Sequence, residues 1–256
     1  GTCKLYDNLS QPLSHPIFLN VEGDFIQNGG IIDLCNNSFS NARTTLQISG
    51  NNYRANAGEI KSTASGAYYG NIEFRHIGIL NYFNNNSHSL NRIKQSIEPE
   101  CKLSANSEIF EISSGSAPDN NYLEIKSGAI LNLNEARINP SGNDYYSGIS
   151  LAENSILKIG SAIGIEAIDL QSSIHAQYSI DKQSTIELNG SSSKISPLNN
   201  LTALVLGKLK VNLSDGGIAN LCTNIIIETE LQLIEGNIHL NKNEISIQNN
   251  TAQAIT

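Results

Sequence analysis

The sequence predicts an all-β fold, a right-handed parallel β-helix (β-solenoid) forming a single elongated domain, and three observations support this. Ile, Asn and Ser, with 35, 34 and 31 copies, supply 100 of the 256 residues. Branched Ile favours a pleated surface, whereas the short side chains of Asn and Ser bond the nearby backbone in turns. No window shows a sustained apolar stripe at helical spacing, and apolar pairs recur at short, nearly constant intervals instead.

The clearest repeat lies in the last third of the chain. Two apolar residues separated by one position mark a strand that turns one face inward. Three such pairs start seven residues apart, at Leu231/Leu233, Ile238/Leu240 and Ile245/Ile247. Three units of a short strand and a tight corner make a coil of about 21 residues, within the size range of β-helix repeats. Stacked coils would bury one continuous core, and Asn and Ser at the corners would form hydrogen-bonded ladders.

The same pattern continues upstream with less regularity, for example at Leu123/Ile125, Ile163/Ile165 and Ile168/Leu170. We therefore expect one solenoid over residues 1–256, with longer, more decorated coils in 1–120 and regular short coils in 121–256. The chain contains no Met, which predicts a fragment of a larger protein. A β-sandwich or meander is the alternative, because it also has short alternating strands. The few hairpin signals and the near-constant spacing favour the solenoid.

Several segments resemble repeats of very large Bacteroidetes surface proteins. Residues 19–34 read LNVEGDFIQNGGIIDL, residues 123–133 read LEIKSGAILNL, and residues 156–161 read ILKIGS. Residues 200–206 (NLTALVL) and 235–240 (EGNIHL) follow in the order found in that family. The resemblance covers most of the chain and is poor between about 62 and 120. It implies a secreted or cell-surface protein, of a family that includes attachment adhesins and cargo of the type IX secretion system.

Composition excludes several function classes. The formal net charge is −8 and the five Arg residues are scattered, which argues against a nucleic-acid partner. No run of 18 apolar residues occurs, so no membrane insertion is expected in this segment. Cys3, Cys35, Cys101 and Cys222 lack the spacing of metal ligands, so we expect neither a metal nor a cofactor. A Cys3–Cys35 disulfide would require the two residues to lie on neighbouring coils.

Catalytic candidates are few. Glu98/Glu100 and Glu228/Glu230 are acidic pairs that would share one face of a strand, as a two-carboxylate site requires. No Arg lies within fifteen residues of Glu228 to neutralise an acidic sugar. The solvated face of a strand explains both pairs more simply, so we predict that the chain is not an enzyme. A polysaccharide lyase or glycoside hydrolase on a β-helix scaffold is the alternative, because the fold alone does not decide between them.

The predicted function is a structural or adhesive segment of a secreted bacterial cell-surface protein, acting as a rigid stalk or display surface. Glycans or other surface polymers are the expected partners, together with other domains of the same polypeptide. Tyr145 and Tyr146 end a Pro-, Asn- and Gly-rich segment predicted to leave the solenoid wall. An exposed tyrosine can stack on a sugar ring, so these two residues are the predicted glycan contacts.

Overall fold

The chain folds as a parallel β-solenoid, which confirms the all-β, parallel β-helix fold that the sequence predicts. The computed structural model describes residues 2–4, 17–35, 44–63, 70–113, 122–141, 146–170, 173, 175–199, 201, 203–249 and 254–256. Within these ranges every strand pair is parallel, and the only helices are two short 3-10 turns. None of the described helices is long and apolar enough to cross a lipid bilayer.

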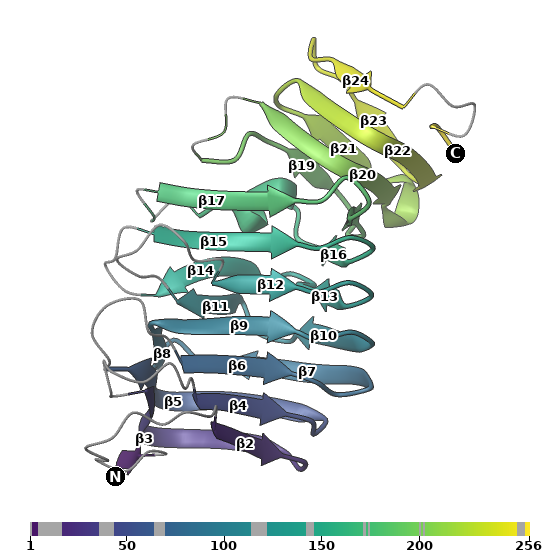
Figure 1. The fold of residues 1–256 in the computed structure, drawn as a ribbon. Helices are drawn as coiled ribbons and strands as arrows, with labels where there is room; N and C mark the ends of the chain where they lie inside the picture. Colours follow the sequence, from purple (N-terminus) through teal and green to yellow (C-terminus); the bar gives the residue numbers. More distant parts are fainter. Residues whose placement is uncertain are drawn as a thin grey trace.

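One long sheet runs the length of the solenoid, because each turn contributes a strand to it (Figure 1). Its strands pair in the order β1 (Thr2–Lys4), β3 (Phe25–Cys35), β5 (Asn52–Ser62), β7 (Gly78–Asn84), β10 (Cys101–Ala105), β13 (Ile130–Asn132), β16 (Ile156–Ile159), β18 (Thr185–Leu188), β20 (Leu204–Asn212), β22 (Ile225–Glu235) and β24 (Ile245–Ile247). A further strand, β8 (His88–Asn91), pairs with β5.

A second sheet follows the solenoid through seven turns and ends at β17. Its strands are β2 (Ile17–Val21), β4 (Thr44–Ile48), β6 (Gly70–Phe74), β9 (Ile93–Ile97), β12 (Leu123–Ile125), β15 (Tyr146–Leu151) and β17 (His175–Ile180). In Figure 1 these strands lie nearly parallel, whereas β20 and β22 are tilted against them. The solenoid therefore bends beyond β17.

The third face is interrupted. It consists of β11 (Ile109–Ser113) and β14 (Arg137–Ser141), then the 3-10 turn η1 (Gly164–Ile168), then β19 (Ser193–Ile195), β21 (Ile218–Leu221) and β23 (Asn237–His239). The turn η1 contacts β14 on one side and β19 on the other. The second 3-10 turn, η2 (Ser214–Gly216), lies before β21. Because η1 replaces a strand, this face lacks one continuous hydrogen-bonded surface.

The core is a set of apolar columns parallel to the solenoid axis. Each turn places one inward side chain directly above its counterpart in the turn before, and all members of the main column are buried. This column is formed by Leu80, Leu103, Leu131, Leu157, Ile186, Leu209 and Leu231. Fully burying one such side chain stabilises the fold by roughly 1.5–3 kcal/mol, so most of the stability comes from contact between turns.

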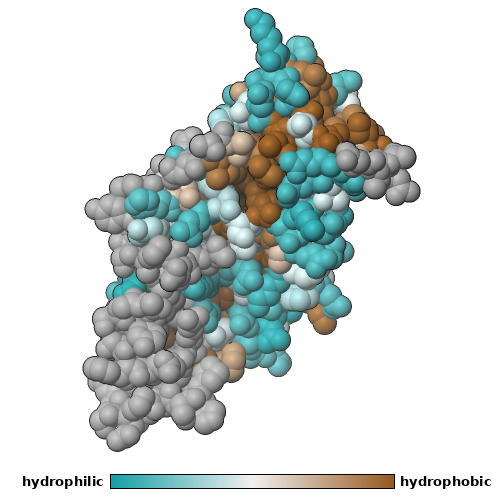
Figure 2. Space-filling view, turned by 45° about the horizontal axis from the view of Figure 1, so that its top comes forward, coloured by the Kyte–Doolittle hydropathy of each residue, from teal (hydrophilic) through white to brown (hydrophobic). Residues whose placement is uncertain are grey.

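The seven-residue repeat near the C-terminus is confirmed. Ile225 pairs with Ile245 one turn later, and β22 and β24 contain the pairs Leu231/Leu233 and Ile245/Ile247, whereas β23 contains Ile238 and ends before Leu240. The last turn covers its own core incompletely, since Leu233, Ile234 and Leu240 are 44%, 60% and 47% exposed. Figure 2 shows the resulting hydrophobic area at this end of the molecule.

Side-chain ladders connect the turns as predicted, although two members of the one that follows lie within β5 and β7 and not at corners. Asn52 donates to Asp24 (2.9 Å), Asn81 to Asn52 (3.4 Å) and Asn106 to Asn81 (3.1 Å), so one ladder spans four turns. Inside the same turns, the rings of Phe25, Tyr53 and Tyr82 stack in this order, with neighbouring centroids 5.0 and 5.1 Å apart, and Phe110 continues the row tilted by 38° at 4.5 Å. Both ladders repeat one interaction at successive turns.

A polar network lies within the N-terminal core. His88 Nδ1 lies 3.0 Å from Glu111 Oε2, and His88 Nε2 lies 3.3 Å from Gln27 Oε1. Glu111 also accepts hydrogen bonds from the Leu90 amide (2.9 Å) and from Asn84 Nδ2 (3.1 Å). The His88 and Glu111 side chains are 0% and 4% exposed, so this network joins turns rather than facing solvent.

Candidate functional site

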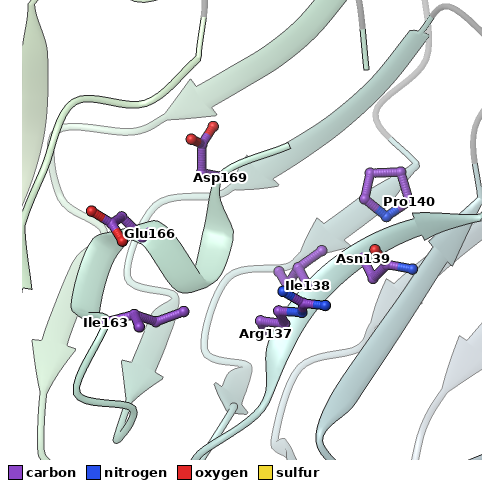
Figure 3. A pocket seen from close by; sticks show the side chains of 7 residues that line it. All are labelled: Arg137, Ile138, Asn139, Pro140, Ile163, Glu166 and Asp169. Carbon is purple, nitrogen blue, oxygen red and sulfur yellow. The ribbon is translucent and has the colours of Figure 1, made fainter. Parts of the chain in front are cut away.

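Two hollows lie along the third face, one between β14 and η1 and the other between η1 and β19. Both are lined by Glu166 and Asp169, and we call the two hollows together the η1 groove. The first hollow, of about 340 Å³, is lined by Arg137, Ile138, Asn139, Pro140, Ile163, Glu166 and Asp169 (Figure 3). The second, of about 530 Å³, is lined by Glu166, Asp169, Lys194, Ser196, Pro197, Leu198, Asn199 and Cys222. The groove therefore crosses from β14 over η1 to β19 and β21.

The groove exists because residues 164–168 do not form the strand that their apolar spacing predicts. The prediction of strand pairs at Ile163/Ile165 and Ile168/Leu170 is wrong here, since the backbone turns at Gly164 (φ +61°). Ile165 and Ile168, three residues apart, are both buried and anchor the turn. A Cβ on Gly164 would lie 2.1 Å from the Lys194 carbonyl oxygen, so glycine also permits the close approach to β19.

Hydrogen bonds from the next turn hold the two carboxylates of the groove. Ser196 Oγ donates to Glu166 Oε1 at 2.9 Å. The Asn199 amide and the Tyr178 hydroxyl donate to Asp169 Oδ1 at 2.8 and 3.2 Å. Burial, and secondarily the charge of Asp169, raise the pKa of Tyr178, so this hydroxyl keeps its proton and remains a donor. The carboxylate positions are thus fixed before any ligand arrives.

The two cations of the groove remain without an acidic partner. Arg137 and Lys194 are both exposed, and among the described residues neither forms an ion pair. Figure 3 shows Glu166 and Asp169 pointing away from the Arg137 guanidinium. The groove therefore presents separate positive and negative groups over an apolar floor that includes the buried Ile138 and Leu198.

Of the two predicted glycan contacts, Tyr146 lies near this groove. Tyr146 opens β15, and its ring stacks against that of His175 in β17, with centroids 4.7 Å apart and planes 20° from parallel. Figure 1 shows that β14 ends, and β15 and β17 begin, at the same side of the solenoid. The ring pair therefore lies around the corner from the groove. Tyr145 lies outside the described residues.

The acidic pairs singled out from the sequence lie elsewhere. Glu98 follows β9 at a corner, where it accepts a hydrogen bond from Ser96 (2.7 Å) and pairs with Lys126 (2.8 Å). Glu100 has a φ of +68°, so the two residues do not share a strand face as predicted. Glu228 lies within an irregularity of β22, where the pairing with β20 shifts register, and Glu230 is the first residue paired after it. Neither pair lines the η1 groove.

Sequence reasoning missed the charged residues of the groove. They come from three turns, with about thirty residues between contacting positions, as for Ser196 and Glu166. The segment GIEAID at 164–169 carried a signal, because its isoleucines are three residues apart and two acids follow the same spacing. That spacing is typical of a 3-10 turn rather than of a strand.

The cysteines do not form a cluster in the described structure. Cys101 is buried and Cys222 is exposed in the groove, and both are free thiols. The backbone of Cys3 pairs with Ile32, but the side chains of Cys3 and Cys35 lie outside the described part, so the disulfide stays a prediction. Among the residues described, no group of three His, Cys, Asp or Glu side chains could hold a metal ion.

Comparisons of the chain with models of known protein families, with curated proteins and with solved structures found no match.

Proposed function

We propose that this chain is a rigid display segment of a secreted bacterial cell-surface protein, and that it binds a glycan chain along the η1 groove. The observation that carries the proposal is the axial course of the groove. It crosses several successive turns and combines fixed carboxylates, an apolar floor and two cations that form no ion pair within the described part of the chain. Sites of this composition bind ligands that have both an apolar face and many polar groups.

The direction of the groove favours a glycan over a strand-adding peptide. A peptide that extends a sheet lies alongside a strand and uses its backbone hydrogen bonds. A ligand in the η1 groove instead runs across β14, η1 and β19, so its contacts are with side chains. In β14 the lining residue Pro140 has no amide hydrogen to donate. A glycan needs no strand edge, and Asn139 and Asn199 offer amides to its hydroxyl groups.

The stacked rings of Tyr146 and His175 support the same function. Each of these stacked rings covers one face of the other, and His175 is the exposed member of the pair, so its ring is the one that the apolar face of a sugar could contact. A chain that leaves the first hollow beside Pro140 would reach this ring at the side where β14 ends. The proposal therefore adds His175 as a glycan contact and keeps Tyr146 as the residue that stacks beneath it.

The proposed cellular setting rests on the sequence. Residues 19–34 and the later repeats resemble large Bacteroidetes surface proteins, which favours export by the type IX system and an adhesive role. The long sheet has eleven strands in a row, which at about 4.8 Å between neighbours gives a rod on the order of 50 Å long. Such a rod holds a binding face away from the surface that carries it.

A polysaccharide-cleaving enzyme is the second candidate, because Glu166 and Asp169 line both hollows. We favour binding without cleavage. Both carboxylates already accept hydrogen bonds from Ser196, Asn199 and Tyr178, which suits fixed acceptors better than groups that exchange protons during a reaction.

One experiment tests both candidates. The protein is incubated with a panel of soluble polysaccharides, and retention and new chain ends are scored together. We expect retention without new ends, and its loss in a variant carrying Arg137→Ala and Lys194→Ala. Lys102→Ala, at an exposed position of β10, is the matched control and should bind normally. New reducing or unsaturated ends that disappear with Glu166→Gln would establish the enzyme instead. Retention unaffected by the double variant would place binding outside the groove.

A further inference from the structure

The order of charges along the η1 groove points to a particular class of ligand. Arg137 lies on β14, Glu166 on η1 with Asp169 directly after it, and Lys194 on β19. Following the axis, the groove is therefore positive, then negative, then positive. We infer that its ligand is a zwitterionic polysaccharide, a chain that carries amino groups between carboxylate or phosphate groups. This inference rests on the proposed glycan-binding function and narrows it.

The charges of the groove are kept apart by the fold. Opposite charges on an exposed surface can approach each other freely, yet no ion pair forms here among the described residues. Ser196 and the Asn199 amide hold Glu166 and Asp169 from the β19 side, and Figure 3 shows both carboxylates directed away from Arg137. The free cations thus remain available to anionic groups, and the carboxylates to a cationic one.

Only a ligand of mixed charge complements all four groups. A polyanion would pair with Arg137 and Lys194 and would be repelled by the two carboxylates between them. A polycation would pair with Glu166 and Asp169 and would be repelled by Arg137 and Lys194. A neutral chain would gain hydrogen bonds and leave the charges to water. A chain with an amino group over Glu166 and Asp169, and an acidic group toward each cation, forms only favourable pairs.

Four forms of one polymer provide the test. Partly N-deacetylated hyaluronan carries amines and carboxylates on a single backbone. Re-acetylation makes it a polyanion, reduction of its carboxylates makes it a polycation, and both treatments make it neutral. Binding is measured for each form by calorimetry. Occupancy of the groove is measured as protection of Cys222 from alkylation, located by peptide mass spectrometry, with Cys222→Ser as the control.

We expect the zwitterionic form to bind about tenfold more tightly than each of the other three, and to protect Cys222. Two variants should separate the charges. Lys194→Ala, which leaves Arg137 in place, should weaken the preference for carboxylates and leave that for amines, whereas Glu166→Gln, which leaves Asp169, should do the opposite. Lys102→Ala should preserve both preferences. Unchanged thermal unfolding would show that each variant is folded.

The alternative outcomes are distinguishable. If all four forms bind equally and protect Cys222, the zwitterion inference is wrong and glycan binding stands. If no form binds or protects Cys222, both proposals are wrong for this ligand class and for the groove. If a peptide of alternating Lys and Glu binds and protects better than the zwitterionic polymer, the ligand is polypeptide and the assignment to polysaccharide fails.

Discussion

The phenol ring of Tyr53 stacks on that of Tyr82 one turn later, with centroids 5.1 Å apart and planes 8° from parallel. Both rings are fully buried, and among the described residues neither hydroxyl has a hydrogen-bond partner. Burial is the main cause that raises the pKa of both tyrosines, and the charge of Glu111 raises the pKa of Tyr53 further. The rings therefore contribute packing to the solenoid, while their hydroxyl groups oppose it.

Tyr53 should accordingly tolerate loss of its hydroxyl but not of its ring. We expect Tyr53→Phe to leave the free energy of unfolding unchanged or to raise it by about 1 kcal/mol, because a buried polar group without a partner is removed. Tyr53→Ala should lower it by about 3–5 kcal/mol, because a ring-sized cavity opens. Urea unfolding measures both. A Phe variant that is markedly less stable would mean that the hydroxyl has a stabilising partner.

Glu111 should be the most sensitive polar position in the core. Glu111→Ala leaves His88, the Leu90 amide and Asn84 without their shared acceptor. We expect it to lower the free energy of unfolding by about 3–5 kcal/mol. Glu111→Gln keeps an acceptor and should lower the free energy of unfolding by less. As a comparison, Glu124→Ala on the outer side of β12 should change stability by about 0.5 kcal/mol or less. Equal losses in the Ala and Gln variants would show that the charge, rather than the acceptor, matters.

Glu187 should make stability depend on pH in the acid range. Burial alone would raise the pKa of this carboxyl, but the hydrogen bond and charge of Lys158, with the charge of Lys210, outweigh burial and lower it. Its stabilising contribution is thus present above the ordinary pKa of 4.5 and is lost as the pH falls through the lowered folded value. Glu187→Gln should reduce stability by about 0.5–1 kcal/mol at pH 7.

The difference between that variant and the unmodified protein should shrink below about pH 4. Thermal unfolding at pH 7, 5, 4 and 3 measures it. A difference that stays constant over this range would show that the effect comes from packing and not from the charge.

Gly164→Ala should disturb the η1 groove. The added Cβ would meet the Lys194 carbonyl at 2.1 Å, and the φ of +61° is unfavourable for any other residue. We expect a loss of about 1–3 kcal/mol in stability and weaker protection of Cys222 by a bound glycan. Gly128→Ala is the control, because its φ of +77° adds similar backbone strain in open space away from the groove. Equal behaviour of the two variants would argue against close packing of η1 on β19.

The sequence predicts the walls of this solenoid better than its groove. Leu131 and Leu133 alternate with polar residues, and alternation is enough to identify an inward face. Which residues lie above one another depends on the length of each turn. That length is 29 residues from Leu157 to Ile186 but 20 from Ile225 to Ile245. Arg137, Glu166 and Lys194 could therefore not be brought together from the sequence.

The prediction for η1 failed for a local reason. Ile163 and Ile165 have the spacing of a strand, but a single left-handed glycine between them changes the direction of the chain. Isolated glycines occur in many strands, so this one could not be distinguished without its neighbour on β19. By contrast, the Asn ladder followed from composition alone, because a stacked corner can satisfy an amide side chain by repetition.

The ladder from Asp24 to Asn106 follows the long axis, as do the backbone hydrogen bonds between turns. Tension applied between the two ends of the rod would therefore pull along these bonds. Each boundary between two turns would carry the full load, because the boundaries follow one another along the axis. Each turn contacts mainly its neighbours, so turns would peel away singly, each releasing 20 to 30 residues of chain. Under flow, a segment built this way would lengthen stepwise and thereby limit the tension, while its remaining turns stay folded.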